Sequence, residues 1–450
     1  KRYESAVKDF SYSNRDEYQT QLVKLSAARC IECMNPRCSE DGCPLESPIP
    51  RWIKLAYHGK WREAAAVLFE ANPFAEITSR VCPAPCQQQC KRALSGFSVG
   101  IRQIEREIAD RAFSQGWVKP TSAVGKSGKK VAIIGSGPAG LAAAWKLAQH
   151  GHSVVIFEKE DVIGGLLRYG IPANRLERHI LSRRVEMLKS QGVQFRKSVH
   201  VGKDISIEQI RNDFDAIVLA IGASRNKDLK VTGRNRSGIY FAIDLLKQYN
   251  LQGSGEIQAK FRDKVVAVIG AGLTGNDCVD LAIASRAKEV HQLEILPPPR
   301  KIDYTADELL MNLPNVHRHW CVSTTAFLGK DSSDDGGALD AIEAVKVVWK
   351  SSANGSVMQV IPDSKIYMQA DVAVLALGFE PVVPDEIARP LGLECDDTGK
   401  IRVNRDFSTS VDGVFAVGDL ATGPTNVATA INSSLKAADK INEYLSKERC

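Results

Sequence analysis

The sequence lacks any long apolar run. No stretch reaches the 18 or so apolar residues that a membrane-spanning helix needs, so no membrane contact is expected. The N-terminal stretch KRYESAVKDFSYSNRDEYQT is polar and has no apolar core of a signal peptide, which favours a cytoplasmic location. The chain starts at Lys1 without Met, so we expect a processed or trimmed start or the edge of a longer polypeptide.

An excess of one charge sign is also missing. The 59 basic and 53 acidic residues give a net charge of only +6 over 450 residues. So small an excess does not indicate a nucleic-acid-binding surface. Hydrophobic residues make up 44% and charged residues 25%, which is typical of globular proteins and excludes disorder over most of the chain. At roughly 150 residues per domain, the length predicts about three domains.

Cysteine is concentrated at one end of the chain. Seven of the eleven cysteines lie in the first ninety residues, and the other four are isolated. A disulfide framework suits small secreted chains, so in this long chain the clustered thiols indicate metal binding. The clustered residues are Cys30, Cys33, Cys38, Cys43, Cys82, Cys86 and Cys90, and the isolated ones are Cys278, Cys321, Cys395 and Cys450.

The spacing of these cysteines is typical of iron–sulfur clusters. The first run, C-x2-C-x4-C-x4-C, closes in Cys43-Pro44, and the second, C-P-x2-C-x3-C, opens in Cys82-Pro83. In two-cluster ferredoxins, a last Cys followed by Pro binds the other cluster. Two four-iron clusters need eight ligands, so one ligand would not be a cysteine. The alternative is a pair of zinc sites completed by His58, the only histidine in the first 120 residues.

Glu105 is the candidate for the eighth ligand. In IRQIEREIADRAF it shares one helical face with Ile101, Ile108 and Ala112. Burying a carboxylate on an apolar face costs free energy unless it is paired or binds a metal. One interpretation is therefore that Glu105 binds a metal. The alternative is that Glu105 lies at the edge of the stripe and reaches solvent.

Residues 119–130 are expected to be a linker, and a dinucleotide-binding motif follows them. The strand VAII leads into Gly135-Ser136-Gly137-Pro138-Ala139-Gly140 and an alanine-rich helix, and the next strand ends at Glu158. The glycines let the backbone approach a pyrophosphate, which the helix N-terminus stabilises. Glu158 lies 23 residues after Gly135, close to the spacing for an acid that binds a ribose hydroxyl.

A second motif, Gly270-Ala271-Gly272-Leu273-Thr274-Gly275, also lies between a strand and a helix. Glu294 follows Gly270 by 24 residues, and its strand carries no basic residue at its end. A 2′-phosphate is normally held by Arg or Lys there, so the sequence favours NADH over NADPH. Two alternatives stay open: Glu294 points to solvent, or Arg300 binds the phosphate from the loop after it.

Disulfide-reductase chemistry is an alternative for a chain with two dinucleotide-binding motifs. It would need a C-x-x-C pair near a bound flavin or on the domain that binds the nicotinamide. The only such pair is Cys30/Cys33, inside the cluster run, which argues against this chemistry.

Near the end of the chain, the strand GVFAV leads into Gly418-Asp419 and a helix. In flavoproteins with two dinucleotide motifs, such an Asp binds the ribityl chain or pyrophosphate of the flavin.

The order of these motifs resembles one family. The Cys-rich segment, GSGPAG, GGLLRYGIP (164–172), IVLAIGAS (217–224), GAGLTGNDC, LALGFEP and GVFAVGD follow one another as in the small (beta) subunit of glutamate synthase. That subunit is similar to the N-terminal part of dihydropyrimidine dehydrogenase. The resemblance implies an α/β fold with two Rossmann-like domains and an N-terminal all-helical iron–sulfur domain. The expected domains are 1–122 (iron–sulfur), 123–245 and 371–450 (FAD), and 246–370 (inserted NAD(P) domain).

The resemblance also implies the ligands of each cofactor. One four-iron cluster would be bound by Cys30, Cys33, Cys38 and Cys90, and the other by Cys43, Cys82, Cys86 and Glu105. FAD would contact Gly135, Ser136, Gly137, Pro138, Ala139, Glu158, Gly165, Leu166, Arg175, Val201, Gly222, Gly418 and Asp419. NADH or NADPH would contact Gly270, Gly272, Leu273, Thr274, Gly275, Glu294 and Gly378.

The implied function is that of an electron-input subunit. NAD(P)H would reduce FAD, and electrons would pass through the clusters to a large subunit, or an equivalent fused region, that makes glutamate from glutamine and 2-oxoglutarate. The cofactors carry this chemistry, so no catalytic side chain is expected. One alternative is a ferredoxin:NADP oxidoreductase or sulfide dehydrogenase-type flavoprotein subunit, and another is a non-catalytic electron relay or scaffold.

The sequence departs from the family pattern at three places. Leu273 replaces the Asp of the usual G-G-G-D-T-G motif, Ser433-Ser434 replaces a Glu-Gly pair, and Ala421-Thr422 replaces an Arg-Arg pair. These changes lie near the expected nicotinamide and flavin sites. Leu273 is the feature that supports the relay alternative.

Overall fold

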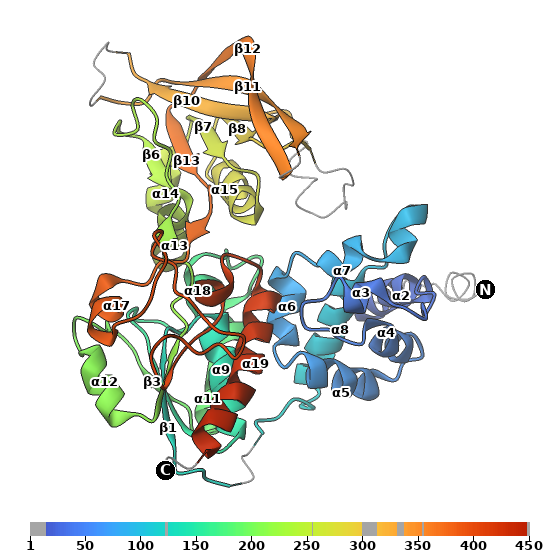
Figure 1. Cartoon of the computed structure of the whole chain (residues 1–450). Helices are drawn as coiled ribbons and strands as arrows, with labels where there is room; N and C mark the ends of the chain where they lie inside the picture. Colours follow the sequence, from blue (N-terminus) through green and yellow to red (C-terminus); the bar gives the residue numbers. More distant parts are fainter. Residues whose placement is uncertain are drawn as a thin grey trace. The chain divides into compact units, whose positions relative to one another are not determined.

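The chain divides into two compact units (Figure 1). The computed structural model describes residues 15–121, 125–253, 255–298, 313–330, 337–352 and 355–447. The first unit consists of Lys1–Arg168, Asn174–Ser224 and Pro381–Cys450, and the second of Tyr169–Ala173 and Arg225–Glu380. No helix among the described residues is long and apolar enough to cross a membrane.

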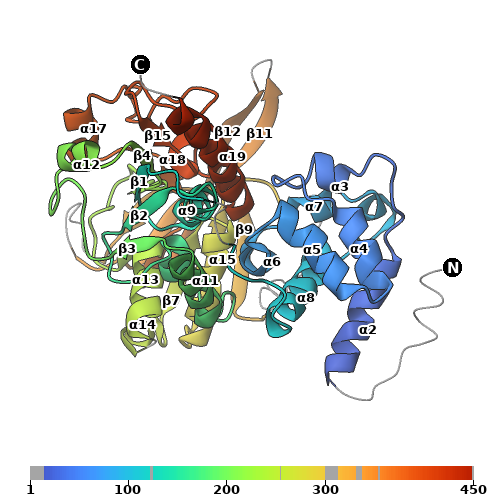
Figure 2. The same ribbon diagram turned by 90° about the horizontal axis from the view of Figure 1, so that it is seen from below.

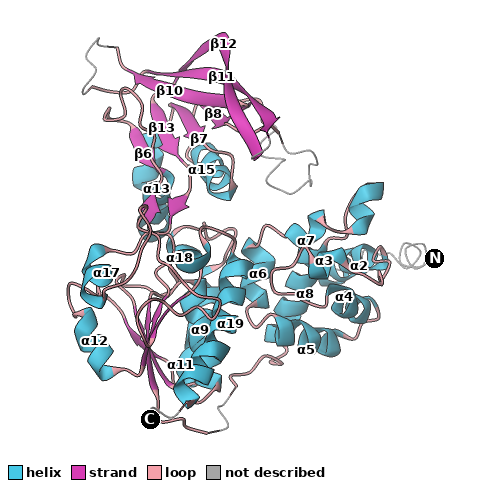
Figure 3. Ribbon diagram, viewed as in Figure 1, coloured by secondary structure: helices cyan, strands magenta, loops and turns pink. Residues whose placement is uncertain are grey.

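Short helices build the N-terminal part of the first unit, as Figure 3 shows in cyan. Proline stands in the first turn of two of them, where its missing N–H costs nothing because first-turn amides have no intrahelical acceptor. The helices are α2 (Arg15–Ala28), α3 (Arg37–Glu40), α4 (Ile49–Tyr57), α5 (Trp61–Ala71), α6 (Ala75–Val81), α7 (Pro85–Gln88), the 3-10 helix η1 (Lys91–Ser95) and α8 (Ile101–Ser114).

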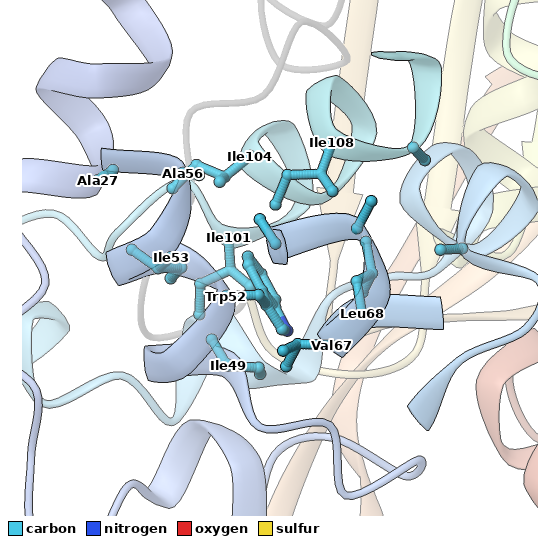
Figure 4. Close-up of a cluster of buried hydrophobic side chains, with 14 of the residues drawn as sticks. Ala27, Ile49, Trp52, Ile53, Ala56, Val67, Leu68, Ile101, Ile104 and Ile108 are labelled. Carbon is cyan, nitrogen blue, oxygen red and sulfur yellow. The ribbon is translucent and has the colours of Figure 1, made fainter. Parts of the chain in front are cut away.

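The core of this helical part lies between α4, α5 and α8 (Figure 4). Ile101, Ile108 and Ala112 of the predicted apolar stripe are all fully buried in α8. Trp52 packs beside them, and its indole N–H donates to Ser47 Oγ at 3.0 Å. Burying side chains of this kind contributes roughly 1.5–3 kcal/mol each. Five of the seven clustered cysteines pack against this core, which therefore supports the loops that carry them.

A parallel five-stranded sheet forms the rest of the first unit, in the order β15-β4-β1-β2-β3. Its central strand VAII is buried on both faces, because α9 and α19 pack together on one face (Figure 2) while α12 and α17 lie on the other. The strands are β1 (Lys130–Ile134), β2 (Ser153–Phe157), β3 (Gln194–Arg196), β4 (Ala216–Leu219) and β15 (Val414–Ala416). The helices are α9 (Pro138–Gln149), α10 (Leu166–Tyr169), α11 (Arg178–Ser190), α12 (Ile207–Asp213), α17 (Asp385–Leu391), α18 (Asp419–Thr422) and α19 (Val427–Ser446).

The second unit repeats this plan with the strand order β6-β13-β7-β8-β9, again parallel. Helices cover one face, and a three-stranded antiparallel sheet, β10-β11-β12, packs its apolar side against the other. The parallel strands are β6 (Ile239–Phe241), β7 (Val265–Ile269), β8 (Glu289–Glu294), β9 (Val316–Trp320) and β13 (Val372–Leu375), and the helices are α13 (Ala242–Gln252), α14 (Gly255–Phe261) and α15 (Leu273–Ala284). The antiparallel strands are β10 (Val322–Leu328), β11 (Ala341–Ser352) and β12 (Gly355–Gln369), and β5 (Arg225–Asn226) pairs with β14 (Phe379–Glu380).

These elements match the predicted fold class, an α/β chain with two Rossmann-like sheets after a helical domain. The borders of the inserted unit differ from the expected 246 and 370. Strand β6 precedes residue 246 and β13 follows residue 370, yet the two pair with each other in the second sheet. The inserted unit therefore begins at Arg225, and the first unit resumes at Pro381.

Candidate functional site

Four of the expected cluster ligands line one pocket in the helical domain. Glu105 lies in α8, Cys82 is the residue at which α6 ends, Cys86 lies in α7, and Cys43 follows α3. The structure thus brings together Cys43, Cys82, Cys86 and Glu105, the set that the family resemblance implies for one cluster.

Two backbone features bring these cysteines to the pocket. Ala84, between Cys82 and Cys86, adopts the left-handed conformation with φ +53°, which turns the chain sharply before α7. A non-glycine residue holds this conformation only where its surroundings impose it. A Cβ on Gly42 would lie 2.7 Å from the Cα of Cys86, so glycine lets the two cysteine loops approach closely.

The protonation of this set depends on burial. Burial, together with the nearby charges of Glu105 and Cys43, raises the pKa of Cys82 to about 12. Burial outweighs the hydrogen bonds from Thr78 and Asn72 and raises the pKa of Glu105 to about 7. A thiol with so high a pKa keeps its proton until a metal ion displaces it. The donor set of three thiols and a carboxylate therefore fits an iron–sulfur cluster.

The remaining four cysteines form a second set. Burial raises the pKa of Cys30, and the charges of Cys90 and Cys33 raise it further. Burial, together with the charges of Cys90 and Cys30, raises the pKa of Cys38 to about 11. Cys38 also raises the pKa of Cys86 in the first set, so the charges of the two sets reach one another. The family resemblance implies this division, and both the division and the binding of a cluster by each set stay predictions.

The zinc alternative requires His58 beside the thiols. Within the described ranges, no group of three or more His, Cys, Asp and Glu side chains is placed to hold a single metal ion. A four-iron cluster spreads its ligands over different irons, so it does not need such convergence. His58 lies at the end of α4 with its ring against Tyr57, and it does not line the pocket.

The loop between β1 and α9 has the shape of a pyrophosphate-binding turn. A Cβ on Gly135 would lie 2.5 Å from the carbonyl oxygen of Ala220, and one on Gly140 would lie 2.1 Å from that of Gly135. Both positions therefore require glycine. A Cβ on Gly137 would meet no atom within 4 Å, so there is open space where α9 begins. A phosphate group fits this cradle, because the first amides of α9 are free to donate to it.

Glu158 lies buried beside this loop. One carboxylate oxygen, Oε2, accepts hydrogen bonds from the hydroxyl of Ser136 and from its amide at 3.0 Å, and Oε1 accepts from the amide of Glu160 at 3.0 Å. These bonds fix the carboxylate at the end of β2, where an acid can bind a ribose.

The Gly418-Asp419 turn contacts the same region. A Cβ on Gly418 would lie 2.6 Å from the Cβ of Ala139, so glycine brings this turn onto the first turn of α9. Burial raises the pKa of Asp419, and its Oδ1 accepts from the hydroxyl and amide of Thr425 at 2.9 and 3.1 Å. The Gly418 amide donates to Ser433 Oγ at 3.1 Å. Ser433, one of the departures from the family pattern, therefore holds the turn, a role that sequence reasoning missed.

The other expected FAD residues are less closely grouped. A Cβ on Gly165 would lie 2.9 Å from the Cα of Gly137, which places Gly165 beside the loop. Leu166 is exposed and Arg175 half-buried, whereas Val201 is buried and bridges to Ile205. The geometry therefore does not bring Val201 to the loop through any described contact.

The second motif repeats the first in detail. A Cβ on Gly270 or Gly275 would strike a backbone oxygen at 2.4 or 2.1 Å, whereas one on Gly272 would meet no atom within 4 Å. Glu294 Oε2 accepts from the amide of Ala271 at 2.7 Å, and Oε1 accepts from that of Leu296 at 2.9 Å. Glu294 therefore points to the loop, where it is half-buried.

A second pocket lies at the start of α15 in this unit. It is lined by the predicted residues Thr274 and Gly378 and by Asn226 and Lys227, which sequence reasoning did not single out. Leu273, at the first position of α15, is 40% exposed. Arg300, the alternative partner of a 2′-phosphate, lies outside the described residues.

Comparison with known proteins agrees with this arrangement. Residues 129–434 match the family described as pyridine nucleotide-disulphide oxidoreductase, and residues 7–117 match dihydropyrimidine dehydrogenase domain II, 4Fe-4S cluster. The solved structure of Mycobacterium tuberculosis FprA in complex with NADPH has a TM-score of 0.57 and 18% identity, and the match covers 70% of this chain and 84% of that one. At this identity the likeness shows the fold alone.

The sequence relatives are much more similar. The small chain of NADPH glutamate synthase from Mycobacterium tuberculosis is 38% identical over 448 residues, which cover 96% of this chain and 90% of the relative. Its counterpart in Bacillus subtilis is 35% identical over 460 residues, 95% and 92% of the two chains. NADH glutamate synthase of Saccharomyces cerevisiae is 36% identical over 94% of this chain, which corresponds to 21% of that longer protein. The chain is an oxidoreductase that belongs to the glutamate synthase small chain family.

Proposed function

We propose that this chain binds FAD at its first dinucleotide loop, NADH at its second and two four-iron clusters in its helical domain, as the electron-input subunit of a glutamate synthase. When bound, these groups supply the redox chemistry, in which NADH reduces the flavin and electrons pass through the clusters to the part that makes glutamate. The observation that carries the proposal is the pocket lined by Cys43, Cys82, Cys86 and Glu105.

Shared helices between the expected cluster site and the expected flavin site support the proposal. Ala428, in the first turn of α19, lines the same pocket as Glu105. Helix α19 packs along α9, and Asn426 caps its start by accepting from the amides of Ala428 and Thr429. Since α9 begins at the Gly135–Gly140 loop, one pair of helices connects the two sites within the first unit.

The preference for NADH rests on Glu294. Its carboxylate is fixed beside the loop, and the residues after it, Ile295 and Leu296, are apolar and exposed. A 2′-phosphate placed there would meet the negative charge of Glu294, and the two residues after it supply no cation. The relatives from Mycobacterium tuberculosis and Bacillus subtilis carry NADPH in their names, so the proposal distinguishes this chain from them.

The proposed partner is a glutamate synthase large chain or an equivalent fused region, of the kind implied by the length of the yeast relative. The proposed location is the cytoplasm, where thiols remain reduced and available to iron. Mixing the purified chain with a large chain should make glutamate formation from glutamine and 2-oxoglutarate depend on NADH. If NADH were oxidised with an artificial acceptor but no glutamate formed with any such partner, the ferredoxin:NADP oxidoreductase alternative would be favoured.

A further inference from the structure

The carboxylate of Glu105 is held by two neutral hydrogen-bond donors. Its Oε1 accepts from Thr78 Oγ1 at 2.9 Å and from Asn72 Nδ2 at 3.0 Å. Both donors are only 2% exposed, and both line the pocket of Cys43, Cys82 and Cys86. Both bonds go to the same oxygen, which leaves Oε2 as the atom that can bind iron.

These donors are themselves fixed by the fold. Asn72 is the C-cap residue that follows α5, and its Oδ1 accepts from the amide of Phe74 at 3.2 Å. Its side-chain amide also donates to Thr78 Oγ1 at 2.6 Å, so both of its hydrogens are used and its orientation is set. Thr78 lies in α6, all of whose residues are buried. Neither side chain can swing away without breaking a buried hydrogen bond.

The neutrality of the donors has a chemical consequence. A cation paired with Glu105 would compete with iron for the carboxylate, whereas neutral donors orient it and leave its charge for the metal. The charge of Arg102 lowers the pKa of Glu105, but its guanidinium donates to the carbonyl oxygen of Cys82 at 3.1 Å. Arg102 therefore supports the cysteine loop and does not bind Glu105 directly.

We propose that Asn72 and Thr78 are positioning residues that orient Glu105 toward its cluster and tune the reduction potential of that cluster. This inference rests on the proposed function, because Glu105 is a ligand only if the cluster is present. Hydrogen bonds to a ligand withdraw electron density from the metal, so losing one should favour the oxidised cluster.

Thr78→Val tests the proposal, because valine keeps the shape and loses the hydroxyl. Thr78→Ser keeps the hydroxyl. Ser79→Ala is the matched control, since Ser79 is the next residue of α6 and its buried hydroxyl has no partner. The full-length chain would be reconstituted with iron and sulfide, and each variant would be compared by iron content, low-temperature EPR and redox titration.

The expected result is that Thr78→Val changes the EPR signal of one cluster and moves its midpoint to a more negative potential, while Thr78→Ser and Ser79→Ala match the wild type. Loss of half the iron in Thr78→Val alone would also support the proposal, because only the hydroxyl separates it from Thr78→Ser. Unchanged spectra and potentials in Thr78→Val, or equal losses in all three variants, would overturn it. A wild-type chain that binds no iron would overturn the proposed function as well.

Discussion

Glu158 and Glu294 end corresponding strands and make corresponding contacts. Each accepts from the amide of the second motif residue, Ser136 or Ala271, and from the amide two positions after itself. The sequence predicted both acids from their spacing to the glycines. Because each carboxylate contacts only its own glycine loop in these bonds, we expect each to affect the binding of only the nucleotide at that loop.

This expectation gives a reciprocal pair of variants. Glu158→Gln keeps the shape and removes the charge, so it should weaken FAD binding by the roughly 1.5–3 kcal/mol of a charge-assisted hydrogen bond, or about 10–150-fold in Kd. Glu294→Gln should raise the KM for NADH and leave FAD bound. Flavin titration of the apoprotein and steady-state kinetics with ferricyanide measure the two effects. Release of FAD by Glu294→Gln would contradict the assignment of the loops.

At the scale of elements, the helices and strands that the sequence predicted are those specified by a short stretch of residues. The strand, glycine loop, helix and acid of each motif lie within about thirty residues, and all appear as expected. The pairing of β6 with β13 joins segments more than a hundred residues apart, which no local pattern reveals. The same holds for Asn72 and Thr78, whose roles exist only once α5 and α6 meet α8. A spacing motif could not have found them.

Gly137, which has open space beside it, and Gly140, which has none, should respond differently to substitution by alanine. Gly137→Ala places a methyl group in open space, so the chain should fold but lose FAD, because the methyl group occupies the phosphate cradle. Gly140→Ala places it 2.1 Å from the carbonyl oxygen of Gly135, so the loop and sheet should be disrupted. Thermal unfolding and flavin absorbance distinguish the two outcomes. A Gly137→Ala chain that binds FAD as tightly as the wild type would show that the cradle holds no phosphate.

A buried ion pair joins α6 to α11. Arg184 Nε lies 2.7 Å from Glu76 Oε1, and both side chains are almost fully buried. Arg184→Met leaves the Glu76 charge without this partner and should lower the free energy of unfolding by about 3–5 kcal/mol. Adding Glu76→Gln should recover much of this loss, because the uncompensated charge is then gone.

The exposed pair of Arg389 and Asp385, on α17, is the control for this prediction. Arg389→Met should change stability by less than about 1 kcal/mol, because exposed pairs contribute little. Urea unfolding of the four chains gives the comparison. If Arg184→Met lowered the free energy of unfolding no more than Arg389→Met does, the buried ion pair would not stabilise the packing of the helical domain against the flavin-binding part of the first unit.

At the scale of the whole molecule, the chain combines a helical thiol-rich domain with two copies of one nucleotide-binding plan. Both copies keep the glycines that sterics require. A preference between NADH and NADPH must therefore come from the side chains around the second loop. We predict a higher kcat/KM for NADH than for NADPH with ferricyanide as acceptor. Glu294→Arg should reduce this preference, since it replaces a repelling charge with a phosphate partner. A higher kcat/KM for NADPH in the wild type would contradict the prediction and point to Arg300.

We predict that the helical domain holds two four-iron clusters, with Glu105 as a ligand of one. Iron, labile sulfide and zinc would be assayed in the purified wild-type chain and in Glu105→Ala. Glu107→Ala is the control, because Glu107 lies on the same helix and pairs with Arg111. We predict about eight irons and eight sulfides per chain, falling to about four of each in Glu105→Ala only. Zinc in place of iron, or an unchanged iron content in Glu105→Ala, would contradict the account.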